Sequence, residues 1–231
     1  MADLLEFGAQ PLTDLLSEAL RQRLEAAAAC VSYDDGETIH ARGDLKPGLS
    51  IVSKGAVRFA IPGADGSYVT TSVLGPGHCF GEATLFARLP RTHDAIAVGD
   101  TSISQISKTQ FDRILDDEPE LARRMLEATT QRLYSVLDFL DDVRRLPLKV
   151  RAAKLISGMA RTAKRPGMIE GNQSDLAFTL GVSRVSIGKA LAALQQEEIL
   201  ALGYGYVFVP DLARLERWIA ARSPLQPLVQ R

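Results

Sequence analysis

The chain has 231 residues, of which 46% are hydrophobic and 24% charged, and its formal net charge at pH 7 is −1. This is the composition of a globular protein, and the length suffices for one large domain or two ordinary ones. No uninterrupted apolar run approaches the ~20 residues of a membrane span, so we expect no membrane partner. Cys30 and Cys79 lie far apart and no secretion signal opens the chain, which predicts a soluble protein of the reducing cytoplasm.

The first part of the chain predicts a helix followed by a β-rich domain. Between residues 11 and 29 apolar residues recur at helical spacing, which predicts an amphipathic helix. Short β-type runs punctuated by glycines follow, as is typical of a sandwich or a small barrel. The predicted strands cover residues 38–40, 49–52, 56–61, 68–74, 95–98 and 102–106. With a short helix over residues 108–115, this domain occupies residues 1–117.

One segment of this domain is richer in functional residue types than a barrel requires. The glycines of residues 75–81 precede a short helical stretch over 84–89, and such a turn can direct free backbone amides at an anion. Glu82 could accept a hydrogen bond from a sugar hydroxyl, and Arg91 could supply the charge for a phosphate. From the residues alone, a glycine turn at a barrel rim and a solvated arginine remain an equal alternative.

A long helix is predicted over residues 118–145. We expect Asp117 to cap it, with Glu120 completing a capping box and Pro147 beyond its end. Its apolar residues recur with alternating spacings of three and four, which is typical of a coiled coil. They are Leu126, Thr129, Leu133, Val136, Leu140 and Val143. We interpret residues 118–146 as a dimerisation helix. A helix packed on its own domain is the alternative.

The remaining residues, 147–231, predict a helical domain. After a helix over 150–163, residues 173–199 read as two helices joined by a turn at Gly181, with Ser183 capping the second, which is a helix-turn-helix. Two β-type runs, 200–202 and 206–209, flank a glycine turn and predict a wing, and a capped helix closes the domain. The N-terminus of the second helix would enter a DNA major groove. A plain helical interaction domain is the alternative.

The charges of the two parts differ in sign. Residues 1–146 hold 15 Lys and Arg against 22 Asp and Glu, whereas residues 147–231 hold 12 against 6. A basic C-terminal part on an acidic body is expected where only that part binds a polyanion. Chance variation between domains is the alternative.

The stretch PGHCFGEATLFARLPRT resembles the phosphate-binding cassette of cyclic-nucleotide-binding domains. The resemblance implies that the backbone amides of Gly81 and Ala83 bind the cyclic phosphate and that Glu82 accepts from the ribose 2′-hydroxyl. It also implies that Arg91 and Thr92 hold the phosphate. Where bacterial members read adenine with hydroxyl side chains on the long helix, the aligned residues here are apolar, which leaves base recognition open. These residues are Val136 and Leu137.

The order of the parts resembles the CRP/FNR family of bacterial transcription regulators. The resemblance implies an α+β fold with an N-terminal jelly-roll-like β-roll, a long dimerisation helix and a C-terminal winged helix-turn-helix domain. The stretch GVSRVSIGKAL is similar to the family's DNA-reading core. By that likeness Arg184 would contact a guanine, Ser186 and Lys189 would hold phosphate or a base edge, and Val185 would at most touch a thymine methyl. The implied DNA-binding residues are Gln173, Ser183, Arg184, Val185, Ser186 and Lys189.

We therefore expect a homodimeric transcription regulator that senses a cyclic nucleotide, cAMP or cGMP, and thereby controls its binding to a palindromic operator in double-stranded DNA. RNA polymerase would be a further partner if the protein is an activator. The alternatives are a non-nucleotide effector, constitutive DNA binding, or a nucleotide-binding module acting on a protein. No nucleophile–base pair or paired carboxylates stand at useful spacing, so we expect no enzyme. His78 and Cys79 lack a second His/Cys cluster, so we expect no metal site.

Overall fold

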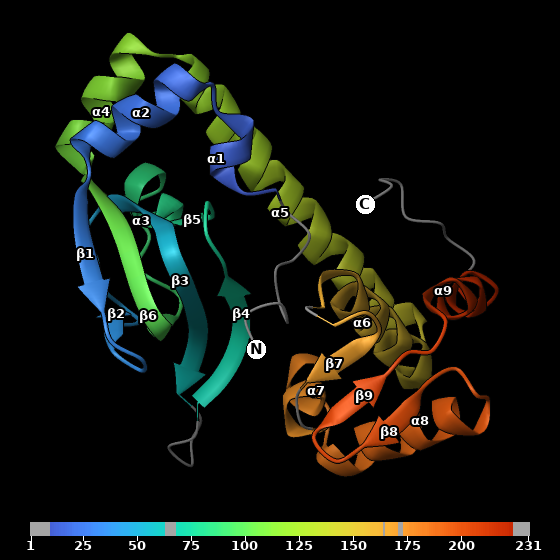
Figure 1. Cartoon of the computed structure of the whole chain (residues 1–231). Helices are drawn as coiled ribbons and strands as arrows, with labels where there is room; N and C mark the ends of the chain where they lie inside the picture. The colour runs from blue at the N-terminus through green and yellow to red at the C-terminus, as the bar shows by residue number, and fades with distance from the viewer. Residues whose placement is uncertain (1–9, 63–67, 164, 171–172, 224–231) are drawn as a thin grey trace. The chain divides into compact units, whose positions relative to one another are not determined.

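The computed structural model describes residues 10–62, 68–163, 165–170 and 173–223 (Figure 1). They form two compact units, the first ending at Ser135 and the second beginning at Val136. The first unit combines a β-sheet with helices, and the second is mostly helical with a small sheet, so the predicted α+β fold class is confirmed. None of the helices in these ranges is both long and apolar enough to span a membrane.

The sheet of the first unit is built on two long antiparallel strands, β3 (Gly48–Pro62) and β6 (Asp94–Ser107). The strand order is β1-β6-β3-β4, with β2 also paired to β6 and β5 also paired to β3. The other strands are β1 (Ala29–Tyr33), β2 (Thr38–His40), β4 (Tyr68–Leu74) and β5 (Cys79–Phe80). The predicted strands 38–40 and 68–74 are confirmed, whereas the sequence pattern does not predict β1 and β5.

Each long strand combines two of the predicted strands, so the prediction of four separate strands here is wrong. Gly55 lies between the two predicted strands in β3, and Gly99 lies between the two in β6. The register of β3 against β6 shifts between Val52 and Ala56, and the chain then continues in the same sheet. Gly55 has a φ of +76°, and a Cβ there would lie 2.6 Å from the carbonyl oxygen of Asp100. These glycines therefore mark bulges rather than turns.

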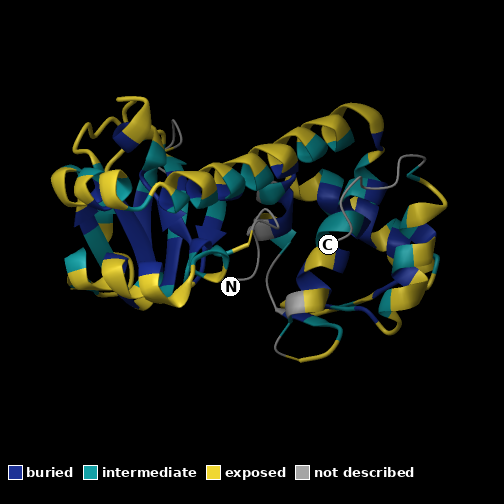
Figure 2. Cartoon of the chain, turned by 90° about the horizontal axis from the view of Figure 1, so that it is seen from above, coloured by how far each residue is buried: buried dark blue, intermediate teal, exposed yellow. Residues whose placement is uncertain are grey.

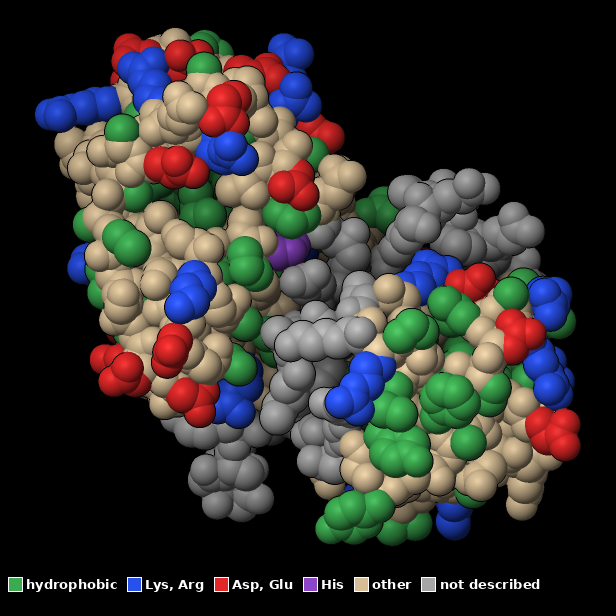
Figure 3. All heavy atoms as spheres, in the orientation of Figure 1, with side chains coloured by type: hydrophobic (Ala, Val, Ile, Leu, Met, Phe, Trp, Pro, Cys, Tyr) green, Lys and Arg blue, Asp and Glu red, His purple; other side chains and the backbone are tan. Residues whose placement is uncertain are grey.

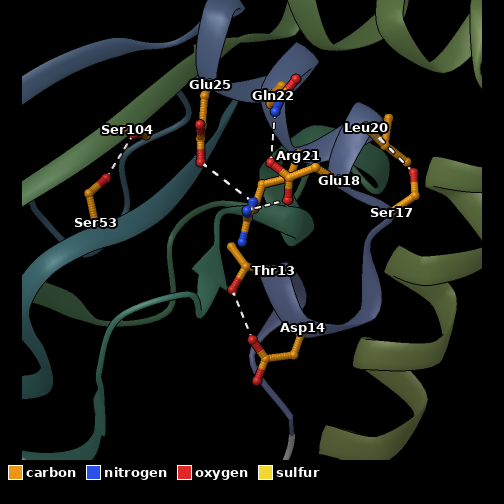
Figure 4. A network of polar contacts seen from close by, with 10 residues as sticks. All are labelled: Thr13, Asp14, Ser17, Glu18, Leu20, Arg21, Gln22, Glu25, Ser53 and Ser104. Carbon is orange, nitrogen blue, oxygen red and sulfur yellow. Dashed lines mark hydrogen bonds and ion pairs between the residues drawn. The ribbon is translucent and has the colours of Figure 1, made fainter.

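Two helices, α1 (Leu12–Leu15) and α2 (Glu18–Ala27), occupy the region where one is predicted. The chain breaks between them because Ser17 is extended and caps α2, its hydroxyl accepting a hydrogen bond from the N–H of Leu20 (Figure 4). A polar cap residue thus interrupts a continuous apolar pattern.

The predicted cap of the long helix at Asp117 is wrong. Asp117 is the last residue of α4 (Lys108–Asp117), and its carboxylate pairs with Arg23 of α2. Arg23 also bonds the carboxylate of Glu118 at 2.9 Å. The long helix, α5 (Glu120–Arg145), begins three residues after Asp117. The two acidic residues therefore tie α2 to the end of α4.

One hydrophobic core of the first unit lies between the helices and the sheet (Figure 2). A second cluster of buried side chains is carried by the strands themselves. The first cluster is fixed by Phe111 of α4 and Leu121 of α5, both fully buried, against Leu49 and Ile106 of the long strands. Burial of these side chains stabilises the unit by about 1.5–3 kcal/mol each. The beginning of α5 is therefore part of this core.

Helix α5 has two distinct faces. One face carries the buried residues Leu121, Met125 and Ala128. The other is an apolar stripe that the described residues leave exposed, with relative exposures from 39% at Val143 to 68% at Leu126. The large apolar residues of this stripe are Leu126, Leu133, Val136, Leu140 and Val143. The buried residues that pack α5 on its own domain are therefore a different set from the heptad residues.

The second unit confirms the predicted helix-turn-helix and wing. Its helices are α6 (Leu148–Thr162), α7 (Gln173–Thr179), α8 (Arg184–Gln196) and α9 (Leu212–Ala220). Its small sheet has the order β7-β9-β8 and is formed by β7 (Met168–Glu170), β8 (Ala201–Gly203) and β9 (Tyr206–Phe208). The sequence pattern does not predict strand β7. The core is formed by side chains that are fully buried: Ile156, Ile187, Leu191, Leu194 and Leu215.

Candidate functional site

The first unit contains a cavity of about 190 Å³. Its walls come from β2, β3, β4, β5, the loop before β6, α5, and a short helix, α3 (Glu82–Phe86). The lining residues are His40, Phe59, Ser72, Leu74, His78, Phe80, Gly81, Glu82, Ala83, Arg91, Thr92, His93 and Arg132. Five of the residues predicted to bind an effector are therefore brought together around one cavity.

Gly81 occupies a position that no other residue could take without strain. It precedes α3 with a φ of +109°, and a Cβ there would lie 2.3 Å from the carbonyl oxygen of Gly48 and 2.6 Å from Nη1 of Arg91. The carbonyl of Gly81 accepts a hydrogen bond of 2.8 Å from the hydroxyl of Thr84. The missing side chain thus lets the guanidinium of Arg91 lie directly against the backbone at the start of α3.

Arg91 is held by its backbone but not by its side chain. Its N–H donates to the carbonyl of Asp44 at 2.9 Å, and its carbonyl accepts from the N–H of Gly43 at 2.8 Å. The described residues give its guanidinium no hydrogen bond and no ion pair. Partial burial lowers the pKa of Arg91, which the charge of Glu82 opposes, but an arginine keeps its proton. A half-buried cation without an acceptor can bind an anion.

Glu82 is already engaged by a residue that sequence reasoning missed. Nη1 of Arg132, on α5, donates to Oε1 of Glu82 at 3.0 Å, and Nη2 donates to the carbonyl of Cys79 at 3.1 Å. The thiol of Cys79 also donates to Oε1 of Glu82, at 3.2 Å, and burial raises the pKa of that thiol well above its usual value. Arg132 precedes the predicted Val136 by one helical turn, so a search of the same helix face could have found it.

All three histidines of the chain line the cavity. His40 contacts two phenyl rings, with centroid distances of 6.2 Å to Phe59 and 5.5 Å to Phe80. Nδ1 of His93 lies 2.8 Å from the hydroxyl of Thr92. Within the ranges that the structure describes, no three His, Cys, Asp or Glu side chains are grouped as metal ligands. The histidines are therefore polar lining groups of the cavity.

The other two predicted effector residues, Val136 and Leu137, belong to the second unit. Both lie on α5, and their relative exposures are 42% and 50%. The cavity described above is lined by the first unit alone.

The start of α8 displays the residues predicted to bind DNA. The hydroxyl of Ser183 caps the helix by accepting from the N–H of Ser186 at 3.1 Å, and Gly181 makes the preceding turn with a φ of +64°. The side chains of Arg184 and Lys189 are exposed. The opposite face of α8 is buried, with Ile187, Ala190, Leu191 and Leu194 in the core.

Gln173 joins these residues from the start of α7. A Cβ on Gly188 would lie 3.3 Å from Oε1 of Gln173, so this amide lies against the exposed side of α8. Val185, at the second position of α8, is 67% exposed. The structure thus places all six predicted DNA-binding residues on or beside one face of the helix-turn-helix.

Two family models match the chain. They are the cyclic nucleotide-binding domain over residues 30–118 and the Crp-like helix-turn-helix domain over residues 150–218. The chain belongs to the CRP/FNR family of transcription regulators. It is a DNA-binding regulator of this type and not an enzyme, as the sequence predicts.

Two bacterial relatives of this CRP/FNR regulator match over most of their length. The cyclic AMP receptor protein of Thermus thermophilus is 29% identical over 184 residues, which cover 80% of this chain and 85% of the relative. The CRP-like cAMP-activated global transcriptional regulator of Mycobacterium tuberculosis is 26% identical over 196 residues, which cover 81% and 86%.

Solved structures of the family share the fold. The Thermus thermophilus catabolite activator protein has a TM-score of 0.52 and 26% identity, covering 93% of this chain and 100% of that one. Another CRP/FNR-family regulator from the same organism has a TM-score of 0.70 and 23% identity, covering 84% and 100%.

The wing of the CRP/FNR regulator carries exposed aromatic residues that sequence reasoning did not single out. Tyr204, at the turn between β8 and β9, is fully exposed. The ring of Tyr206 lies over Gly203, where a Cβ would be 2.1 Å from its Cζ. On the face shown in Figure 3, hydrophobic side chains gather over the small sheet of the second unit. The glycines flanking Tyr204 are the signal that marks this turn.

Proposed function

We propose that the regulator binds a cyclic nucleotide in the cavity of its first unit and that this ligand controls the binding of a homodimer to palindromic DNA. The observation that carries the proposal is the guanidinium of Arg91, which is half-buried, lies against Gly81 and has no acceptor among the described residues. A cyclic phosphate is a monoanion that would supply the acceptor. The family's cyclic nucleotide-binding model over residues 30–118 supports the same ligand class.

The proposed roles in the cavity follow from the chemistry of each group. Arg91 pairs with the phosphate, Thr92 adds a hydroxyl, and the backbone amides of Gly81 and Ala83 donate to the phosphate oxygens. Glu82 accepts from the ribose 2′-hydroxyl, and Arg132 already holds its carboxylate at 3.0 Å. Since the names of two relatives include cAMP, cAMP is the first ligand to test and cGMP the second.

The proposed dimer uses the apolar stripe of α5, which leaves large side chains such as Leu126 and Leu140 in contact with water. Pairing two copies of the stripe would bury them. In this scheme residues 1–117 form the effector domain, 118–146 the dimerisation helix and 147–231 the DNA-binding domain. A ligand that favours one arrangement of the paired helices would space the two α8 helices by ~34 Å for a palindromic site.

A thermal-unfolding titration with cAMP and with cGMP tests the effector. Ligand at a hundredfold excess over its Kd stabilises the folded state by about 2.7 kcal/mol, which for a chain of this length appears as a rise in Tm of about 5–11 °C. If neither nucleotide raises the Tm, the ligand is another small anion or the regulator acts without one. The apolar side chains of Val136 and Leu137 would then explain why neither nucleotide binds.

Replacing Arg184 by alanine tests the DNA-binding face. Because Arg184 is exposed at the start of α8, we expect the variant to keep its fold, to lose ~1–3 kcal/mol in binding to an operator selected from a random duplex pool, and to relax the preference for guanine. Arg161→Ala, on α6, is the control, since that guanidinium pairs with Glu216 at 2.7 Å within the same unit. If the variant selects the same guanines as the wild type, Arg184 has no role in base reading. RNA polymerase is a further proposed partner if transcription from such an operator is activated.

A further inference from the structure

Among the described residues, two nitrogen-bearing side chains that line the cavity have no hydrogen-bond partner, and only one of them belongs to the cassette. Arg91 is the first. The second is His40, at the end of β2, whose imidazole makes no hydrogen bond or ion pair within the described residues. Its neighbour His93 differs, because the hydroxyl of Thr92 lies 2.8 Å from its Nδ1. An unpaired, half-buried polar group costs free energy unless a ligand supplies the missing hydrogen bond.

The imidazole of His40 is fixed before any ligand arrives. It is tilted against Phe80 at a centroid distance of 5.5 Å, and Phe80 and Phe59 pack edge to face at 5.3 Å. The backbone of His40 pairs with Ala95 of β6. A side chain held in this way loses little conformational entropy when it makes a contact. Phe80 directly precedes Gly81, so the ring is held next to the start of α3.

The charge state of His40 is set by its surroundings. Burial, and then the charge of Arg91, lower the pKa of His40 to about 4, while Asp44 and Asp94 oppose this shift. The other titratable groups that line the cavity are Glu82, Arg132, His78 and His93. At pH 7 the imidazole is therefore neutral, with one N–H donor and one acceptor nitrogen. A neutral imidazole next to the guanidinium of Arg91 can donate a hydrogen bond to an anion, and it adds no second buried positive charge beside that of Arg91.

We propose that His40 is a second ligand-binding residue for the anion held by Arg91, donating its N–H to an exocyclic oxygen of the cyclic phosphate. The inference rests on the proposed function, because the cyclic phosphate is the anion invoked there. It adds a residue from strand β2 to a phosphate site that otherwise consists of Gly81 to Thr92. It also makes His40 a specificity residue, since it selects ligands with a second anionic oxygen facing the aromatic cluster.

Two substitutions of His40 separate the effect of its N–H donor on binding from the effect of its ring packing. His40→Phe keeps a ring of similar size against Phe59 and Phe80 but removes the N–H, whereas His40→Gln keeps a donor. We expect His40→Phe to weaken cAMP binding by about tenfold, the effect of one lost hydrogen bond to a charged acceptor, and His40→Gln to retain most of the affinity. Binding is measured by calorimetry at pH 7, and the Tm without ligand checks that both variants are folded.

The two phosphorothioate diastereomers of cAMP identify the contacted atom. Each replaces one exocyclic oxygen with sulfur, a poor acceptor. One diastereomer should bind the wild type about tenfold more weakly than cAMP does. In His40→Phe the same diastereomer and cAMP should bind with equal affinity, because that variant no longer makes the contact. The 2′-deoxy analogue is the control, since its penalty reports Glu82 and should be equal in both proteins. If both diastereomers keep their full penalties in His40→Phe, or if the 2′-deoxy penalty is the one that disappears, the inference is wrong.

Failure of the inference can be distinguished from failure of the proposed function. If the wild type binds neither cAMP nor cGMP, the proposed ligand is wrong. The imidazole resonances of His40 are then followed by NMR during a titration with sulfate, in wild type and in Arg91→Gln. A shift that requires Arg91 supports an anion contact at His40 for another ligand class. No shift at His40 overturns the inference as well.

Discussion

Replacing Arg91 by glutamine is expected to weaken cyclic nucleotide binding by at least about 100-fold, because the guanidinium is the only full positive charge that the cavity offers without a partner among the described residues. A single hydrogen bond to a charged group contributes ~1.5–3 kcal/mol, and a guanidinium makes two to a phosphate. Isothermal titration with cAMP at pH 7 measures the loss.

The same substitution should leave the stability of the ligand-free protein unchanged or slightly increased. Most buried charges are paired, and removing one partner destabilises the fold. Arg91 has no such partner among the described residues, so its replacement removes a desolvated charge and breaks no ion pair. Arg88→Gln is the matched control, since Arg88 is exposed and does not line the cavity. Equal affinity for cAMP in the wild type and Arg91→Gln would contradict the proposal that Arg91 binds the phosphate.

Replacing Leu140 by lysine is expected to convert the proposed dimer into a monomer. Leu140 is 42% exposed in the stripe of α5, and a lysine there would place two ammonium groups in an apolar interface. A monomer binds a palindrome through one half-site only, so we expect operator affinity to fall by about 100-fold or more. Light scattering measures the oligomeric state, and fluorescence anisotropy measures DNA binding.

Asp138→Lys is the control for this experiment. Asp138 lies on the same helix two residues earlier, which is the opposite face at about 100° per residue. The variant should remain a dimer and should bind DNA at least as well as the wild type. If both lysine variants are dimers of equal affinity, the interface lies elsewhere on the molecule.

The features that the sequence predicts best are those determined by neighbouring residues. The helix-turn-helix and the wing follow from short-range signals such as Gly181, the Ser183 cap and the glycines beside Tyr204, and the structure confirms them. The cassette residues also lie close together in sequence, so a stretch of about 17 residues was enough to predict five residues that line one cavity.

The features that the sequence does not predict depend on distant partners. A glycine at a bulge looks like a glycine at a turn, and only the pairing of β3 with β6 distinguishes them at Gly55. Asp117 lies in a sequence pattern typical of a helix cap, but its carboxylate pairs with Arg23, which is 94 residues away. Arg132 reaches Glu82 across 50 residues of sequence. The sequence around these residues does not identify their partners, so the partnerships required the folded chain, although a search of the helix face of Val136 would have singled out Arg132 itself.

The two faces of α5 have a consequence for how the chain can change in length. The buried face around Leu121 and Met125 and the exposed stripe around Leu140 and Val143 are carried by one uninterrupted helix. Adding a single residue between Met125 and Leu140 would rotate everything beyond it by about 100°, whereas adding seven would rotate it by only ~20° and lengthen the helix by about 10 Å. The angular phase of α5 is thus more constrained than its length, and tolerated insertions should come in multiples of about seven residues.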